Sequence, residues 1–176
     1  MLEHDIFGTK PRKKSINSKK KGNNNEVQAA KWWASWTSYE FQRVPQSGGL
    51  RWKDTRGITG DLFCSEDNFP ISIETKAYKS LSIPKISKRL RNDSKIYRFW
   101  EQALADGKRA DREPCLFVRE NGMKANTWYF VVKSNLGVYM RMMNKKLNFY
   151  MGNGIMIFKS EDVIKLDWIK IKNFLL

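Results

Sequence analysis

An acidic and a basic side chain two residues apart, Glu74 and Lys76, are the residues of this sequence best suited to chemistry. They lie in the run 70–78, where apolar and polar residues alternate as they do in a half-buried strand. Alternate residues of a strand are roughly 6.6 Å apart on one face, so the two side chains project side by side. A carboxylate and an ammonium so placed can hold a metal ion and a water or phosphate oxygen in one place. In isolation, such a pair is more often an ion pair on a solvated face.

Two further acids precede this pair in positions that favour the chemical interpretation. Asp61 opens a short strand-like run, Gly60 to Cys64, just before the predicted strand 70–78. Glu26 begins an amphipathic helical pattern and lies on the side of Ala30 and Trp33, which we expect to face the core. An acid there either favours the helix N-terminus through the helix dipole or adds a carboxylate beside a metal ion.

The elements that must position these residues follow from hydrophobic periodicity. Asn23, Asn24 and Asn25 supply capping chemistry for the first helix. Continuous apolar runs indicate strands covered on both faces, and a three- and four-residue spacing indicates a helix. The pattern predicts strands over 39–44, 60–64, 70–78, 115–118 and 128–132, a helix over 96–107, an edge strand over 155–158 and a final helix capped by Ser160. This order predicts an α/β fold in which helices flank a mixed central β-sheet. We expect a basic, flexible tail over 1–22 and one domain over 23–176, of which 133–176 form a family-specific C-terminal extension.

Charge and composition limit the function further. The chain has 33 Lys and Arg against 18 Asp and Glu, a net charge of +15, which indicates a polyanionic partner. No apolar run is long enough to span a bilayer, and neither a signal peptide nor a lipidation or amphipathic membrane signal is visible. We therefore expect an intracellular, cytoplasmic protein that binds nucleic acid and no membrane.

The scarcity of histidine and cysteine argues against other chemistries. His4 is the single histidine, and Cys64 and Cys115 are the two cysteines, far apart in the sequence. The sequence therefore offers few ligands for a zinc site and few residues for a nucleophile activated by histidine. Both cysteines lie in apolar strand-like runs, which favours buried reduced thiols. A single disulfide bond between them is the alternative.

Two basic segments are candidates for phosphate contacts. The loop after Pro45 combines Gly48 with cations and an aromatic residue, so that its backbone amides could approach a phosphate closely. The segment 79–95 is rich in Lys and Arg with few acids. The candidate DNA-binding residues are Ser47, Gly48, Arg51, Lys53, Arg56, Lys79, Lys85, Lys88, Arg89 and Arg91. The tail carries further basic clusters, which either grip phosphates or merely solubilise the chain.

The ordered set of an acid in the first helix, an acid after a hairpin and E-x-K on the next strand resembles the PD-(D/E)XK nuclease superfamily. Within it, the Ser-Gly loop and the Gln-bearing helix after the E-x-K strand look like those of the archaeal-type Holliday junction resolvases and their phage relatives. The resemblance covers roughly residues 22–132. One departure is that Gly60, rather than a proline, precedes Asp61.

This resemblance implies a restriction-endonuclease-like core and a set of residue roles. Asp61, Glu74 and the Thr75 carbonyl would hold Mg²⁺, with Mn²⁺ as a substitute, while Glu26 would hold a metal-bound water or a second ion. Lys76 would orient or help deprotonate the attacking water. Gln102 would help to position the water or the DNA backbone, although a plain surface role is open for it.

The function implied is a metal-dependent DNA endonuclease that resolves Holliday junctions or other branched DNA as a homodimer, including the phage-encoded case in a bacterial host. Symmetric cuts across a junction require two active sites related by a dyad. A site-specific homing or restriction-type endonuclease of the same fold is one alternative. A non-catalytic nucleic-acid-binding protein, in which Glu74 and Lys76 merely pair, is another.

Overall fold

A mixed five-stranded sheet forms the centre of the protein in a computed structural model that describes residues 18–44, 60–81, 83, 89–90 and 94–176. The strand order is β3-β4-β5-β7-β6; β3 runs parallel to β4, and the other neighbours are antiparallel. The strands are β3 (Ile71–Tyr78), β4 (Glu113–Glu120), β5 (Tyr129–Lys133), β6 (Phe149–Gly152) and β7 (Ile155–Lys159). A separate antiparallel pair, β1 (Phe41–Arg43) and β2 (Leu62–Cys64), lies beside β3.

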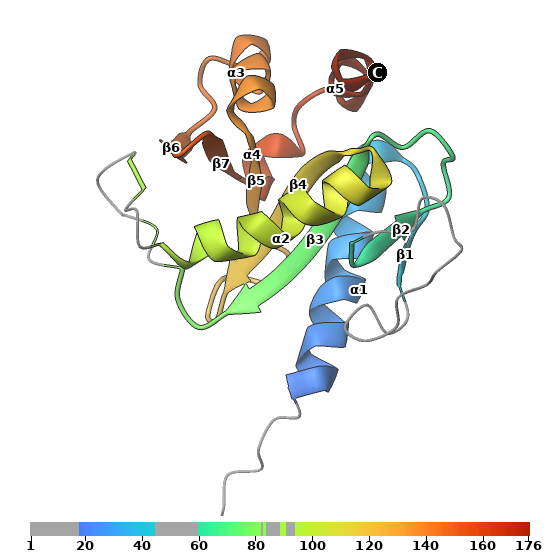
Figure 1. Ribbon diagram of the computed structural model, residues 1–176, viewed down its shortest axis with the longest axis vertical. Coiled ribbons are helices and arrows are strands. Elements are labelled where there is room, and N and C mark those ends of the chain that lie inside the picture. Colours follow the sequence, from blue (N-terminus) through green and yellow to red (C-terminus); the bar gives the residue numbers. More distant parts are fainter. Residues whose placement is uncertain (1–17, 45–59, 82, 84–88, 91–93) are drawn as a thin grey trace, which may run out of the picture.

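Helices cover both faces of this sheet (Figure 1). They are α1 (Ser18–Thr37), α2 (Lys95–Ala110), α3 (Ser134–Met143), α4 (Ser160–Val163) and α5 (Trp168–Leu175). Apolar side chains of α1, α3, α4 and α5 share one buried cluster with one face of the sheet. The α2 helix packs on the opposite face, where Ile96, Trp100 and Ala103 meet Leu116 and Val118 of β4. The fold is therefore an α/β, restriction-endonuclease-like core.

The connection through α2 makes the parallel pairing of β3 and β4 possible, because parallel neighbours need a long crossover. The helix begins where the Ser94 side chain accepts a hydrogen bond from the Ile96 amide. It ends at Asp111, which adopts a left-handed conformation. Its length brings the chain back to the start of β4, so that Ile71 pairs with Glu113 and Glu74 with Leu116.

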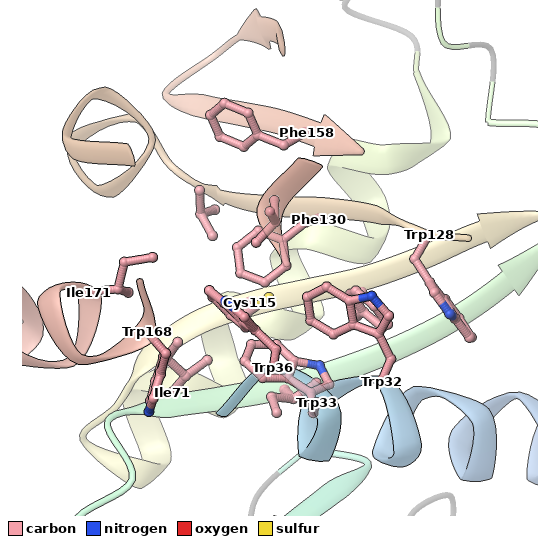
Figure 2. Close-up of a cluster of buried hydrophobic side chains, with 14 of the residues drawn as sticks. Trp32, Trp33, Trp36, Ile71, Cys115, Trp128, Phe130, Phe158, Trp168 and Ile171 are labelled. Atoms are coloured by element: carbon pink, nitrogen blue, oxygen red, sulfur yellow. The ribbon is translucent and has the colours of Figure 1, made fainter. Parts of the chain in front are cut away.

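An aromatic cluster fixes α1 against the sheet (Figure 2). Trp33 is fully buried, with its ring centroid 5.5 Å from that of Phe130 and 5.9 Å from that of Phe117. Trp168 of α5 joins the cluster through Trp36, at 5.2 Å between centroids. Buried aromatic rings contribute large apolar areas and prefer such tilted and edge-on contacts. The cluster holds the first helix in place beside β3, the strand that carries the E-x-K residues.

Several predicted elements are confirmed. The strands β1 to β5 and the helix α2 all lie where the periodicity places them, with small differences at their ends. Ala29, Ala30, Trp33 and Trp36 of α1 are buried as expected, and Trp32 is buried with them. Within the described part of the chain both cysteines are free and buried. No helix among the described residues is long and apolar enough to cross a membrane.

Other predictions about single elements are wrong. The first helix begins at Ser18, before the asparagines that were expected to cap it. The strand β7 is not at the edge but lies between β5 and β6, and its apolar run is buried accordingly. Ser160 does not cap one long final helix: it opens the short α4, where its hydroxyl accepts a hydrogen bond from the Trp128 amide. A second helix, α5, follows, capped by Asp167.

The segment 133–176 builds much of the molecule. It includes α3 and β6, neither of which was predicted, and it completes the sheet through the β5–β7 and β7–β6 pairings. Trp168 and Ile171 of this segment belong to the main core cluster. The residues that were expected to form an extension therefore pack into the same core as α1.

Candidate active site

The position of Asp61 is set by a backbone turn against the free edge of β3. Gly60 adopts a φ of +78°, and a Cβ atom built on it would overlap the carbonyl oxygen of Ile73. Only glycine fits such a turn at so close an approach. The Asp61 amide then donates a hydrogen bond of 2.9 Å to the Ile73 carbonyl, and its own carbonyl accepts one of 3.0 Å from Val44. This explains why glycine can stand where the family pattern has proline.

The Asp61 carboxylate is turned toward the following part of β3. Its Oδ2 atom accepts hydrogen bonds from the Thr75 amide at 2.9 Å and from the Thr75 hydroxyl at 3.0 Å. Both residues are buried. These two hydrogen bonds hold Asp61 in a defined orientation beside Glu74 and Lys76.

Glu74 and Lys76 complete the cluster from the same face of β3. Glu74 is buried, with 1 % of its surface exposed, and Lys76 is half-buried. The Lys76 ammonium pairs with Oε1 of Glu74, and it lies 3.9 Å from Oδ2 of Asp61. The structure therefore brings together the carboxylates of Asp61 and Glu74 and the ammonium of Lys76. We refer to these three residues as the carboxylate–lysine cluster.

The burial of Glu74 corrects one expectation and has an electrostatic consequence. The strand is not half-buried: its first five residues are buried on both faces, because α2 covers the side that carries Ser72 and Glu74. Desolvation and the charge of Asp61 together raise the pKa of Glu74 to about 8, although Lys76 partly opposes the rise. For Lys76 itself, burial lowers the pKa, but Glu74 and Asp61 outweigh it and the pKa is raised. The protein thus holds the Glu74 carboxylate in a place where a nearby cation stabilises its charged form.

This shift predicts a pH-dependent stability difference. The folded-state pKa of Glu74 is raised from 4.5 to about 8, so its proton stabilises the fold at low pH and this stabilisation is lost as the pH rises to about 8. Glu74→Gln removes this loss. Without metal, its unfolding free energy relative to the parent should increase by on the order of 2–4 kcal/mol between pH 4.5 and pH 8. Denaturant titrations at both pH values measure this, with the exposed Glu101→Gln as control; a constant difference would contradict the burial argument.

Glu26 lies close to the cluster but has its own partner. Its carboxylate pairs with the guanidinium of Arg43 on β1. Burial raises the pKa of Glu26, Arg43 lowers it, and the charge of Asp61 raises it again. Asp61 and Lys76 are therefore near enough to act on Glu26 electrostatically. A metal-side role for Glu26 remains a prediction, and Arg43 is a neighbour that the sequence pattern did not indicate.

Gln102 is an exposed residue of α2. Phe99, one turn earlier, contacts Tyr78 of β3 with a centroid distance of 5.3 Å. Asp106, one turn later, acts electrostatically on both Glu74 and Lys76. Residues three and four apart share a helix face, so the exposed Gln102 lies between these two, on the side of the cluster.

Asp106 is the residue near the cluster that sequence reasoning missed. It is buried on α2 and pairs with Arg109 in the next turn. On sequence alone, this pair was indistinguishable from a solvated i,i+3 ion pair. The available signal was position: Asp106 falls between Ala103 and Gly107 on the apolar stripe of the helix.

The carboxylate–lysine cluster fits a small, hard cation with few protein ligands. Among the described residues, no group of three or more His, Cys, Asp or Glu side chains could hold one ion together. Mg²⁺ is usually bound through one or two carboxylates, with waters and substrate phosphate oxygens filling the other positions. Asp61 and Glu74 supply such a pair of carboxylates.

Most candidate DNA-binding residues lie outside the described part of the chain. These are Ser47, Gly48, Arg51, Lys53, Arg56, Lys85, Lys88 and Arg91. Lys79 and Arg89 are described, and both are exposed. Lys79 directly follows β3, whereas Arg89 forms an isolated β-bridge with Met151 at the β6 edge. Their contact with DNA remains a prediction.

Comparison with known proteins agrees with the fold. The mixed sheet, the acid before β3 and the E-x-K residues on it define a PD-(D/E)XK nuclease core. The chain belongs to the family described as "Phage putative PDDEXK endonuclease", whose pattern it matches over residues 17–174. Nucleases of this type typically use divalent metal ions.

A phage protein adds context. Protein D14 of Escherichia phage T5 is 28% identical over 112 residues, which cover 61% of this chain and 67% of the phage protein. A phage relative is consistent with a phage-encoded protein. No solved structure matches the chain.

Proposed function

We propose that this protein is a Mg²⁺-dependent endodeoxyribonuclease, with Mn²⁺ as a substitute, that hydrolyses phosphodiester bonds at the carboxylate–lysine cluster. The observation that carries the proposal is the position of the Lys76 ammonium, which pairs with Glu74 and lies 3.9 Å from Asp61 Oδ2. A buried pair of carboxylates with one cation between them is costly in a binding protein, because each charge loses its hydration. It is useful in a hydrolase that must hold a metal ion and a water together.

In the proposed mechanism, Asp61 and Glu74 hold the cation, together with the Thr75 carbonyl by family resemblance. A bound divalent cation lowers the pKa of water and polarises a phosphoryl oxygen. Lys76 orients the attacking water, and its ammonium stabilises the negative charge that develops on the phosphate. The hydrogen bonds from Thr75 keep Asp61 aimed at this position. Glu26 holds a water or a second ion, and Gln102 positions the water or the DNA backbone from α2.

The proposed substrate is branched DNA, including four-way Holliday junctions, and the proposed active form is a homodimer. Support comes from the Ser-Gly loop that precedes Asp61 and from Gln102 on the cluster side of α2, both of which resemble junction resolvases. The net charge of +15 suits a substrate that presents several phosphate backbones at once. Lys79 and Arg89, with the basic residues outside the described part, are the proposed phosphate contacts.

Cleavage assays on matched substrates test this proposal. The protein is incubated with Mg²⁺ and a four-way junction, a linear duplex of the same sequence, or its single strands. We expect paired nicks in the junction and at least about tenfold slower cutting of the duplex. Neither substrate should be cut when EDTA removes the metal. Sedimentation with and without the junction tests for the dimer.

The alternatives give different results in the same assay. Cutting at one discrete site in the duplex, with no faster cutting of the junction, would identify a homing or restriction-type enzyme. Binding of all substrates without cutting in any divalent metal would identify a non-catalytic nucleic-acid-binding protein.

A further inference from the structure

An aromatic pair beside the carboxylate–lysine cluster has no role in the mechanism above. Tyr78 is the last residue of β3 and lies on the same face as Lys76, two residues further along. The residue is 38% exposed, and its ring makes an edge-to-face contact with Phe99 of α2, with centroids 5.3 Å apart and planes at 68°. A large aromatic ring held in place yet open to solvent is available to a partner.

The support behind Tyr78 is rigid. The Tyr78 backbone pairs with Glu120 in the sheet, and its carbonyl accepts a hydrogen bond of 2.8 Å from the Asn121 amide. Phe99 is half-buried against the apolar cluster beneath α2. The two rings pack edge to face, and part of Tyr78 stays exposed. This arrangement preorients the ring at little further entropic cost.

The charges around the pair are complementary to a nucleic-acid backbone. Lys79 follows Tyr78 and is exposed, and Lys95 is exposed one turn before Phe99 on the same side of α2. The exposed acid of this helix, Glu101, is about 160° around the helix axis from Phe99. The nearby Glu120 carboxylate accepts a hydrogen bond from the Leu81 amide. An exposed aromatic residue with two exposed lysines nearby suits a base with its phosphates better than a neutral apolar ligand.

We infer that Tyr78, supported by Phe99, is a stacking platform for an unpaired base next to the scissile phosphate. This inference rests on the proposed function, and it narrows the substrate to DNA with unpaired or easily unstacked nucleotides at the cut. The reason is geometric: Tyr78 is roughly 6.6 Å along the strand from Lys76, so its base belongs to a neighbouring nucleotide. A base inside a continuous duplex is already stacked on its neighbours on both sides, so it cannot also stack on the Tyr78 ring.

Binding of a 2-aminopurine probe in EDTA tests the platform separately from cleavage. One DNA carries the fluorescent base unpaired at a branch point, and the other carries it paired within a continuous duplex of the same sequence. With the unaltered protein, we expect fluorescence quenching for the branched probe only. Tyr78→Ala should abolish the quenching and weaken affinity for that probe by about 5- to 100-fold, and Tyr78→Phe should preserve both. Affinity for the paired probe should change less than twofold.

Phe174→Ala is the matched control, because this aromatic residue is 43% exposed but lies on α5 and stacks on Tyr139 of α3. It should leave the quenching and both affinities unchanged. Absence of quenching with the unaltered protein, or equal losses on both probes in Tyr78→Ala, would overturn the inference. Failure of the proposed function is read separately, as absence of cleavage in every divalent metal, and quenching that persists in that case would still support the platform.

Discussion

Replacing either buried carboxylate, by Asp61→Asn or Glu74→Gln, is expected to slow DNA cleavage by at least about 1,000-fold without weakening DNA binding. The two oxygens proposed to hold the cation come from these residues, and loss of one removes several kcal/mol of charge stabilisation in the transition state. Affinity should be unchanged or slightly higher, because each variant removes a negative charge near the phosphates. Single-turnover cleavage and filter binding in Ca²⁺ measure the two effects.

Both substitutions should leave the fold intact, which separates catalysis from stability. An asparagine oxygen can accept the two Thr75 hydrogen bonds that Oδ2 of Asp61 accepts. A glutamine at position 74 keeps the shape of the buried side chain and removes the charge whose desolvation raises the pKa of Glu74. Glu101→Gln, an exposed neutralisation on α2, is the control and should cleave like the parent. Parental cleavage in either carboxylate variant would refute the site.

The strands and the site order could be predicted because local pattern decides them. The apolar runs at Cys115 and Trp128 had to be strands covered on both sides, and they became β4 and β5. The convergence of Asp61 with Glu74 and Lys76 was expected from an ordered motif, and the three lie together in the structure. The order of elements along the chain does not indicate the order of strands in the sheet. Nothing in the run 155–158 shows whether this strand lies at the edge or, as β7 does, between β5 and β6.

Burial around the site was predicted less well, because it depends on tertiary packing. The polar alternation of β3 indicated one solvated face, but α2 covers that face and buries Glu74. For the same reason Asp106 was not predicted to be near the cluster, and the pairing of Glu26 with Arg43 was not visible. Each of these depends on which element lies opposite, and a single sequence does not specify this. The electrostatics of the site are therefore a product of the fold more than of the motif.

Gly60→Ala is expected to lower the unfolding free energy by about 2–5 kcal/mol and to reduce cleavage even where the protein still folds. An alanine at a φ of +78° costs about 1–2 kcal/mol, and its Cβ would overlap the Ile73 carbonyl oxygen, for which overpacking adds about 1–3 kcal/mol. Relief of the overlap must move the turn away from β3. That movement breaks the hydrogen bond between the Asp61 amide and the Ile73 carbonyl and carries the Asp61 carboxylate away from Thr75.

Two other glycines provide the control for this effect. Gly122 also has a positive φ, of 88°, but a Cβ there would meet nothing within 4 Å, so Gly122→Ala reports backbone strain alone. Gly22 lies in α1 with open space around it, and Gly22→Ala should be neutral or slightly stabilising. Thermal unfolding ranks the three variants, and single-turnover cleavage below their melting temperatures isolates the loss of geometry. If Gly60→Ala cleaved DNA like Gly122→Ala, the turn at Gly60 would not be what positions Asp61, and the metal-holding role of that carboxylate would lose its structural basis.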